Sequence, residues 1–211
     1  MLVETKPLTK TKTIDFDCLY HVGTMNPDDK GSYFSSSYEG SGLSVSLDPD
    51  RWIQIARLGG FPTWKMTRDT PAVFVNYHEL DNSDLERIKA WGESKDYFTE
   101  QDCYTIHWFD DELDEEVYMT FATIEQARAE FPDEDYSDDD ITKETRIIAT
   151  DRLLDRAAID SKEDCTDGLV VAWAEDHGYD GVWWKDEDGP WSCARGTIFA
   201  ENVSDWSSEQ L

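Results

Sequence analysis

Basic residues are scarce in this sequence of 211 residues. Nineteen lysines and arginines stand against 47 aspartates and glutamates, which gives a formal net charge of −28. Binding of free nucleic acid is not expected, because phosphate binding depends on Lys and Arg releasing counterions. Aromatic residues make up 13% of the chain and include nine tryptophans, which argues against a disordered acidic tail. The charge therefore indicates a partner with a basic surface, or a solubilised or salt-adapted protein.

Paired cysteines and long apolar runs are also missing. The four cysteines form no CxxC pair and no Cys/His spacing typical of zinc, so we expect reduced thiols and no metal. They are Cys18, Cys103, Cys165 and Cys193. Residues 1–16 lack the apolar core of a signal peptide, and no apolar run reaches the length of about 18 residues that spans a bilayer. These absences favour a cytoplasmic protein that does not bind membranes.

The length and the order of the expected elements predict one domain of the α+β class. A chain of 211 residues suits a single domain of ordinary size. It shows no internal repeat and no linker. We expect a flexible arm at 1–12, the domain at 13–203 and a tail at 204–211. Many short strands among helices indicate antiparallel sheets with flanking helices.

Apolar periodicity predicts the individual elements. Strands are expected over 13–23, 42–46, 61–68, 71–77 and 145–150, in a hairpin over 96–109 and 115–123, and around an acidic turn within 179–199. The segment 71–77 reads as extended, with a helix as the alternative. Helices are expected over 48–60, 83–94, 123–131 and 167–178, and from about residue 151. Asp48 is a good N-cap ahead of Pro49, and 167–178 reads as the clearest amphipathic helix.

Four local features are candidates for a functional site. They are HVGT at 21–24, GSGLSVS at 40–46, Trp52 on the expected helix, and GYDGVWWKDEDG at 178–189. Each has a plainer reading by itself. A histidine at a strand end is most often structural, and GxG most often marks a turn. A tryptophan on a helix most often belongs to a core, and acids at a hairpin tip are most often solvated.

The order of these features resembles the ADP-ribosyltransferase superfamily. In the branch of diphtheria toxin and the poly-ADP-ribose polymerases, the first strand carries H-G-T/S and the second carries G-x-G-[IL]-Y-F-A. A helix with a second tyrosine follows, and a carboxylate comes late. The block at 178–189 is also similar to the last motif of small phage-encoded members that act as anti-CRISPR proteins. The resemblance spans most of the chain and implies an ADP-ribosyltransferase-like domain with NAD as substrate.

The resemblance implies a role for each motif residue. His21 would donate a hydrogen bond to the adenosine-side ribose, and the main chain at Gly23 or Val22 would pair with the nicotinamide amide. Aromatic side chains would stack on the nicotinamide, and a carboxylate would stabilise the oxocarbenium-like ribosyl cation. The candidates for NAD binding are His21, Gly23, Thr24, Tyr33, Tyr38, Ser44, Ser46 and Trp52, with Phe34 as a further aromatic. The candidates for the acid, in order of preference, are Asp186, Glu187 and Asp188.

Two positions depart from the histidine branch. Val22 separates His21 from Gly23, and Ser44 stands where the family's second-strand tyrosine is expected. The strand S-V-S at 44–46 is instead similar to the S-T-S strand of the arginine-specific toxin branch. The chain therefore combines features of both branches.

Other chemistry-bearing residues give weaker signals. The remaining histidines lie far apart in the sequence, so a histidine metal cluster is not expected. Cys193 is expected to be packed. Arg195 is expected to anchor a carboxylate, with phosphate binding as its less favoured role.

Two functions of different classes fit these observations. The first is an NAD-dependent mono-ADP-ribosyltransferase of a bacterium or phage that modifies a macromolecule, most naturally a basic protein. In the resembled family, elongation of poly-ADP-ribose usually needs a glutamate at the acid position, so the resemblance implies that Asp186 transfers a single unit. The second is a non-catalytic acidic inhibitor that mimics nucleic acid, favoured by 110–116 and 133–140, which hold six acidic residues each. Solvated loops are the plainer reading of these runs. A mimic needs the acidic runs, whereas a transferase needs His21 and Asp186.

Overall fold

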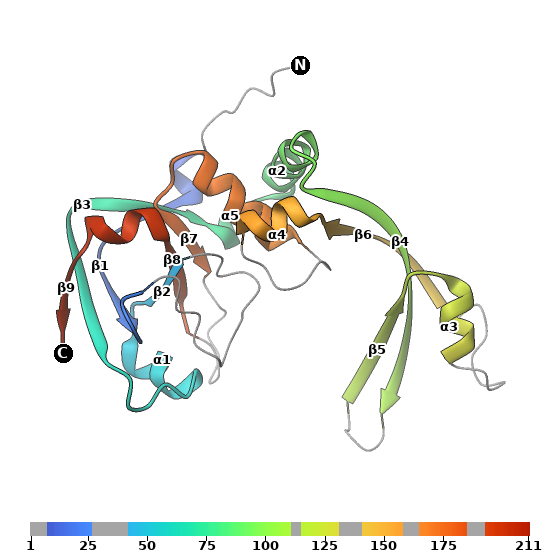
Figure 1. The fold of residues 1–211 in the computed structure, drawn as a ribbon, viewed down its shortest axis with the longest axis horizontal. Helices are drawn as coiled ribbons and strands as arrows, with labels where there is room; N and C mark the ends of the chain where they lie inside the picture. The colour runs from blue at the N-terminus through green and yellow to red at the C-terminus, as the bar shows by residue number, and fades with distance from the viewer. Residues whose placement is uncertain (1–7, 27–41, 111–114, 131–140, 158–164, 185–192) are drawn as a thin grey trace.

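The computed structural model has a mixed α+β architecture, as the sequence predicts (Figure 1). The structure describes residues 8–26, 42–110, 115–130, 141–157, 165–184 and 193–211. The strands are β1 Thr13–Val22, β2 Gly42–Ser46, β3 Thr63–Asn76, β4 Phe98–Asp110, β5 Glu115–Phe121, β6 Ile141–Ala149, β7 Gly181–Trp184, β8 Arg195–Phe199 and β9 Ser207–Gln210. The helices are α1 Pro49–Ile55, α2 Asn82–Ser94, α3 Ile124–Glu130, α4 Asp151–Ala157 and α5 Thr166–Asp176. Short 3-10 helices are η1 Lys10–Lys12, η2 Tyr77–Glu79 and η4 Ala200–Asp205.

Five strands pair around a closed ring. The order is β1-β2-β8-β7-β3, and β3 pairs back to β1 while β9 adds to the other edge of β3. All these pairs are antiparallel except β3 with β7, which is parallel. The ring encloses a core whose centre is a group of three rings. Phe16 lies 4.4 Å from Trp183 and 5.3 Å from Phe74 between ring centroids, and the Phe16–Phe74 contact is edge-to-face.

The long strand β3 joins the two segments that the sequence separates around Pro71. Its register against β1 is irregular, since Phe16 pairs with Ala72 and Cys18 pairs with Thr67. The residues between Thr67 and Ala72 form a bulge, and a bulge tolerates proline because no ladder hydrogen bond is required there. The segment 71–77 is therefore extended over most of its length and not an α-helix.

A second core surrounds helix α5, which differs from the expected amphipathic helix. Seven consecutive residues, Gly168–Ala174, are buried, so the helix is covered on every side over two turns. It packs against α2, α4 and β7. The prediction of an amphipathic face was wrong because the polar residues of 167–178 lie at the ends of the helix, while its middle is apolar all round.

The strands β4, β5 and β6 form a separate antiparallel sheet. The order is β5-β4-β6, and β4–β5 is the hairpin that the sequence predicts. Figure 1 shows this sheet, with α3 beside it, extending away from the six-stranded sheet. On β5, Tyr118 is 64% and Met119 39% exposed; because successive strand residues point to opposite faces, β5 is open on both faces here.

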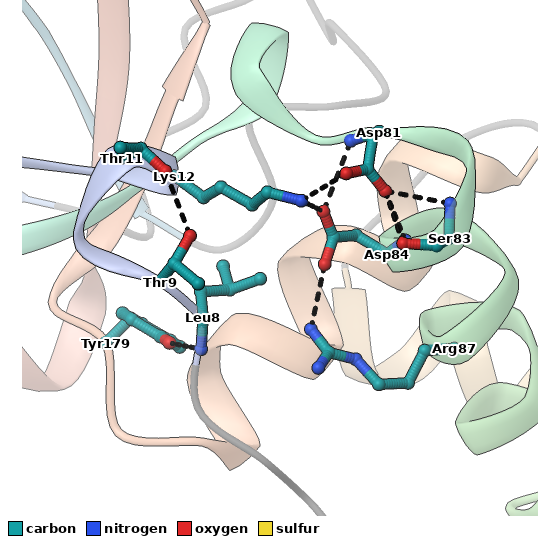
Figure 2. Close-up of polar contacts among 9 residues, drawn as sticks. All are labelled: Leu8, Thr9, Thr11, Lys12, Asp81, Ser83, Asp84, Arg87 and Tyr179. Carbon is teal, nitrogen blue, oxygen red and sulfur yellow. Dashed lines mark hydrogen bonds and ion pairs between the residues drawn. The ribbon is translucent and has the colours of Figure 1, made fainter.

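Residues near both termini belong to the folded structure. From Leu8 onward, the segment expected as a flexible arm lies against the domain, and the Leu8 N–H donates to the Tyr179 hydroxyl at 3.1 Å. Figure 2 shows the Lys12 ammonium between the carboxylates of Asp81 and Asp84. Residues 204–211, expected as a tail, include β9, which pairs with β3 from Trp64 to Thr67. No helix in the described ranges is long and apolar enough to cross a membrane.

Candidate functional site

A row of partnered residues crosses four adjacent strands of the ring. Tyr20 on β1 pairs with Ser46 on β2, and Ser46 pairs with Arg195 on β8. Arg195 pairs in turn with Trp184, the last residue of β7. The row contains residues of two of the four sequence features, Ser46 and Trp184, and Tyr20 directly precedes a third, HVGT. Helix α1 follows β2 directly (Figure 1).

His21 is buried at the end of β1, and main-chain oxygens contact both of its ring nitrogens. Nδ1 lies 2.7 Å from the Ser44 carbonyl oxygen and Nε2 lies 2.8 Å from that of Thr24. Burial lowers the pKa of His21, while the two carbonyls oppose this shift because they favour the doubly protonated ring. The neutral ring has one N–H, so it donates to one carbonyl at a time. His21 thus fastens the end of β1 to β2.

Gly23 has a positive φ, a backbone conformation that favours glycine. Its φ is +138°, and a Cβ at this residue would lie 3.2 Å from the Nε2 of His21. Its N–H donates to the Pro62 carbonyl at 2.9 Å, and its carbonyl accepts a 2.9 Å hydrogen bond from the Trp64 indole N–H. Both main-chain polar groups that the family resemblance assigns to nicotinamide therefore have partners within the chain.

The buried hydroxyl of Ser46 joins three elements. Its Oγ accepts from the Asp48 N–H at 3.0 Å and donates to the Ala194 carbonyl, 3.1 Å away. The Sγ of Cys193 lies 3.2 Å from the same Oγ, and Cys193 is packed, as the sequence predicts. Asp48 caps helix α1 by accepting from the Arg51 N–H at 3.0 Å, which confirms the predicted N-cap. Ser46 therefore fixes the start of α1 against the start of β8.

Trp52 lies on α1 next to Arg195. The guanidinium carbon of Arg195 lies 5.6 Å from the centroid of the Trp52 ring, within the range of a cation–π contact. Trp52 is half-buried. Arg195 of the row therefore lies beside α1.

Gly42 is explained by strand packing. A Cβ at Gly42 would lie 2.3 Å from the Thr197 hydroxyl and 2.5 Å from the Ile198 carbonyl oxygen. Only glycine allows this approach of β2 to β8. The second glycine of the predicted GxG is therefore a packing residue, and Gly40 lies outside the described residues.

The structure brings six of the predicted NAD-binding residues to neighbouring elements. Together these positions cover the end of β1, the adjoining strand β2 and helix α1, and they are His21, Gly23, Thr24, Ser44, Ser46 and Trp52. Six further candidates lie outside the described residues, namely Tyr33, Phe34, Tyr38, Asp186, Glu187 and Asp188. The sequence continues from Trp184 through Lys185 to Asp186. Among the residues that the structure describes, no group of three or more His, Cys, Asp or Glu side chains is placed to hold a metal ion.

Three contributors to this region were not expected at the site. Pro62 and Trp64 hold Gly23 from a strand about 40 positions away, and no local pattern marks such a partner. Arg195 was considered as a carboxylate anchor or a phosphate ligand, and its cation–π contact with Trp52 was not foreseen. Comparison of the chain with family models, curated proteins and solved structures finds no match.

Proposed function

We propose that this chain is an NAD-dependent mono-ADP-ribosyltransferase. The observation that carries the proposal is the register row Tyr20–Ser46–Arg195–Trp184, which aligns the strands that hold the separate motifs. The histidine strand β1 and the Ser-x-Ser strand β2 are neighbours, and β8 lies between β2 and β7, the strand that leads to the late acids. In this proposal the dinucleotide lies across the row of strands.

The reaction needs a carboxylate close to the breaking bond. Loss of nicotinamide leaves positive charge on the ribose, and a carboxylate about 4 Å away stabilises this charge by roughly 4 kcal/mol at an effective dielectric near 20. Asp186 follows the last residue of β7 by two positions, and Glu187 and Asp188 come next. In the proposal Asp186 supplies this carboxylate, and Glu187 is the second candidate.

His21 and Gly23 take modified roles in this proposal. For His21 to bind a ribose hydroxyl, the hydroxyl replaces the Thr24 carbonyl as the partner of Nε2. The main chain of Gly23 is hydrogen-bonded to Pro62 and Trp64. In the proposal Gly23 therefore holds the end of β1 in position and does not bind nicotinamide itself. NAD affinity then depends on His21 through one hydrogen bond, while turnover depends on the acid.

The test is nicotinamide release from NAD by the purified chain. Asp186→Asn should lower turnover by about 100-fold or more, because it removes a charge that acts only in the transition state. Asp138→Asn, in the acidic run at 133–140, is the charge-matched control and should keep full activity. Equal rates for wild type and Asp186→Asn would contradict the assignment of the acid.

A second candidate function has its own supporting observation. The segment 98–149 includes the three-stranded sheet β5-β4-β6. It holds 17 acidic and 3 basic residues, a net charge of −14. Half of the net charge of the chain therefore lies on 52 of its 211 residues. A non-catalytic inhibitor that occupies a basic groove would use this segment. Neutralising the runs at 110–116 and 133–140 would abolish its binding to a basic partner, whereas Asp186→Asn would not.

A further inference from the structure

We infer that the groove between helix α2 and the start of strand β4 binds a basic segment of another protein through lysine or arginine side chains. That this protein is the one to be modified rests on the proposed function. The groove has a volume of about 440 Å³, within the range of about 300–1,000 Å³ that is usual for ligand sites. Its walls include Glu86, Lys89, Ala90 and Glu93 of α2 and Phe98 and Glu100 of β4.

The outward face of α2 forms one wall of the groove. The wall residues on α2 recur every three to four positions, so their side chains lie along one face of the helix. Ile88 and Trp91, on the other side of the helix, are buried in the core. Glu86, Ala90 and Glu93 are exposed, so no element within the described ranges covers this face.

The turn between α2 and β4 fixes the two walls relative to each other. The Tyr97 N–H donates to the Gly92 carbonyl at 3.0 Å. A Cβ at Gly92 would lie 3.4 Å from the ring of Phe98, so this ring lies against the end of α2. Phe98 is also paired with Ala149 on β6. A groove whose walls are held in this way loses little conformational freedom when a ligand binds.

The charges in the groove favour a cationic ligand. Three carboxylates and one ammonium line it, which gives a net charge of −2. Lys89 Nζ lies 3.1 Å from the Glu100 carboxylate, so an ammonium of the chain itself is already bound here. Within the described parts of the chain, Glu86 and Glu93 have no ion pair and can receive cations from another molecule. Phe98 offers apolar surface to the methylene groups of lysine or arginine.

The surroundings of the groove favour a protein segment over a small free cation. β4 continues from the groove into the sheet β5-β4-β6, and Figure 1 shows this sheet extending away from α2. The segment 98–149 carries −14, so negative charge continues along the sheet and steers a basic protein toward this part of the molecule. The register row lies on β1, β2, β8 and β7, so the groove is separate from the proposed NAD site.

The first experiment measures binding of a fluorescein-labelled peptide of alternating arginine and glycine by fluorescence anisotropy, without NAD. Glu86→Lys/Glu93→Lys should weaken binding by about 10-fold or more, because two attractive charges become repulsive. Asp69→Lys/Glu209→Lys is the matched control, because it makes the same change in net charge at exposed positions on β3 and β9. The control should bind within about 2-fold of wild type, because salt screens distant charges.

A variant of opposite sign separates a binding role from a structural one. Lys89→Gln should strengthen peptide binding by about 2- to 5-fold, because it removes a like charge and leaves Glu100 for the peptide. Loss of structure would not increase affinity, and thermal unfolding establishes that each variant is folded. Equal weakening by the groove pair and the control pair, or no gain in Lys89→Gln, would overturn the inference.

The second experiment adds NAD and separates the groove from the proposed function. Glu86→Lys/Glu93→Lys should release nicotinamide at the wild-type rate, and an equal loss of release and of peptide binding would contradict a separate site. With a cell lysate, saturating peptide should reduce labelling of the acceptor protein by wild type, and unchanged labelling would overturn the role in acceptor binding. If wild type binds no peptide but releases nicotinamide, the inference fails and the proposed function stands. If wild type releases no nicotinamide, the proposed function fails, while peptide binding still decides whether the groove takes a basic segment.

Discussion

The hydroxyl of Ser46 donates a 3.1 Å hydrogen bond to the carbonyl oxygen of Ala194, 148 positions later in the chain. The same hydroxyl accepts the Asp48 N–H at 3.0 Å. One fully buried oxygen therefore joins β2, the start of α1 and the start of β8. Ser46 therefore sets the positions of α1 and β8, two elements of the proposed site, relative to β2.

Replacement of this hydroxyl should affect both stability and ligand binding. Ser46→Ala leaves the Asp48 N–H and the Ala194 carbonyl without this partner, which should lower the free energy of unfolding by about 1–3 kcal/mol. ADP-ribose affinity should fall as well, because α1 and β8 lose their shared contact. Urea unfolding and calorimetry check the two effects, with exposed Ser207→Ala on β9 as the control. Unchanged stability in Ser46→Ala would contradict the role of the junction.

His21 should make the fold sensitive to acid. Because burial lowers the pKa of His21, the unfolded chain binds the proton more readily, and stability falls as the pH drops below the ordinary histidine value of about 6.5. His21→Gln should remove this part of the pH dependence. The measurement is urea unfolding at pH 7.5 and 5.5, with the exposed His78→Gln as the control. The same pH slope in wild type and His21→Gln would show that His21 does not titrate in this way.

Glu175 on α5 should act in the opposite direction. Burial and the neighbouring carboxyl of Glu201 raise the pKa of Glu175 to about 7, although the Arg156 guanidinium contacts it and opposes the shift. The folded chain therefore binds a proton between about 4.5 and 7, and this contribution to stability is lost as the pH rises through 7.

The variant Glu175→Gln removes that titration. The free energy of unfolding of Glu175→Gln minus that of wild type should be larger (more stabilising) at pH 8 than at pH 5 by about 1 kcal/mol, a value reduced for solvent screening at a partly exposed site. Chemical denaturation at the two pH values measures the difference, and Glu209→Gln, exposed on β9, is the control. A difference of the opposite sign would contradict the raised pKa.

Lys12 should anchor the N-terminal segment to α2. Its ammonium contacts both carboxylates of the α2 capping box, Asp81 and Asp84, and Asp84 also pairs with Arg87 at 3.1 Å (Figure 2). Lys12→Met should lower the thermal midpoint by a few degrees, because the buried Asp84 keeps one of its two cationic partners. The exposed Lys10→Met is the control and should leave the midpoint unchanged. Equal midpoints for all three proteins would show that the contact does not stabilise the fold.

Local signals in the sequence were sufficient for much of the fold. Asp48 and Pro49 predict the start of α1 because capping and proline preference act within one turn, and the structure has both. Alternation predicts β1, β2 and the β4–β5 hairpin. Local signals do not predict which faces of an element are buried, because contacts with residues far away in the sequence determine this. Helix α5 was expected to be amphipathic and has seven consecutive buried residues, because α2, α4 and β7 pack on it.

The same limit applies to the candidate site. The sequence pattern groups His21, Gly23 and Ser46, and the structure places all three at the end of β1 and on β2. It does not predict that Pro62 and Trp64 occupy the main chain of Gly23, since these partners come from another strand. The cation–π contact of Arg195 with Trp52 likewise depends on the pairing of β2 with β8, which no local motif specifies.

Transfer of label from NAD to protein tests the central claim most directly. Wild type and Asp186→Asn are each incubated with NAD labelled in the adenylate half and a cell lysate, and nicotinamide release is followed in parallel. The account predicts a labelled protein band with wild type, and at least about a 100-fold loss of label and of nicotinamide release with Asp186→Asn. Absence of both label and nicotinamide release with wild type would contradict the transferase and favour the acidic inhibitor.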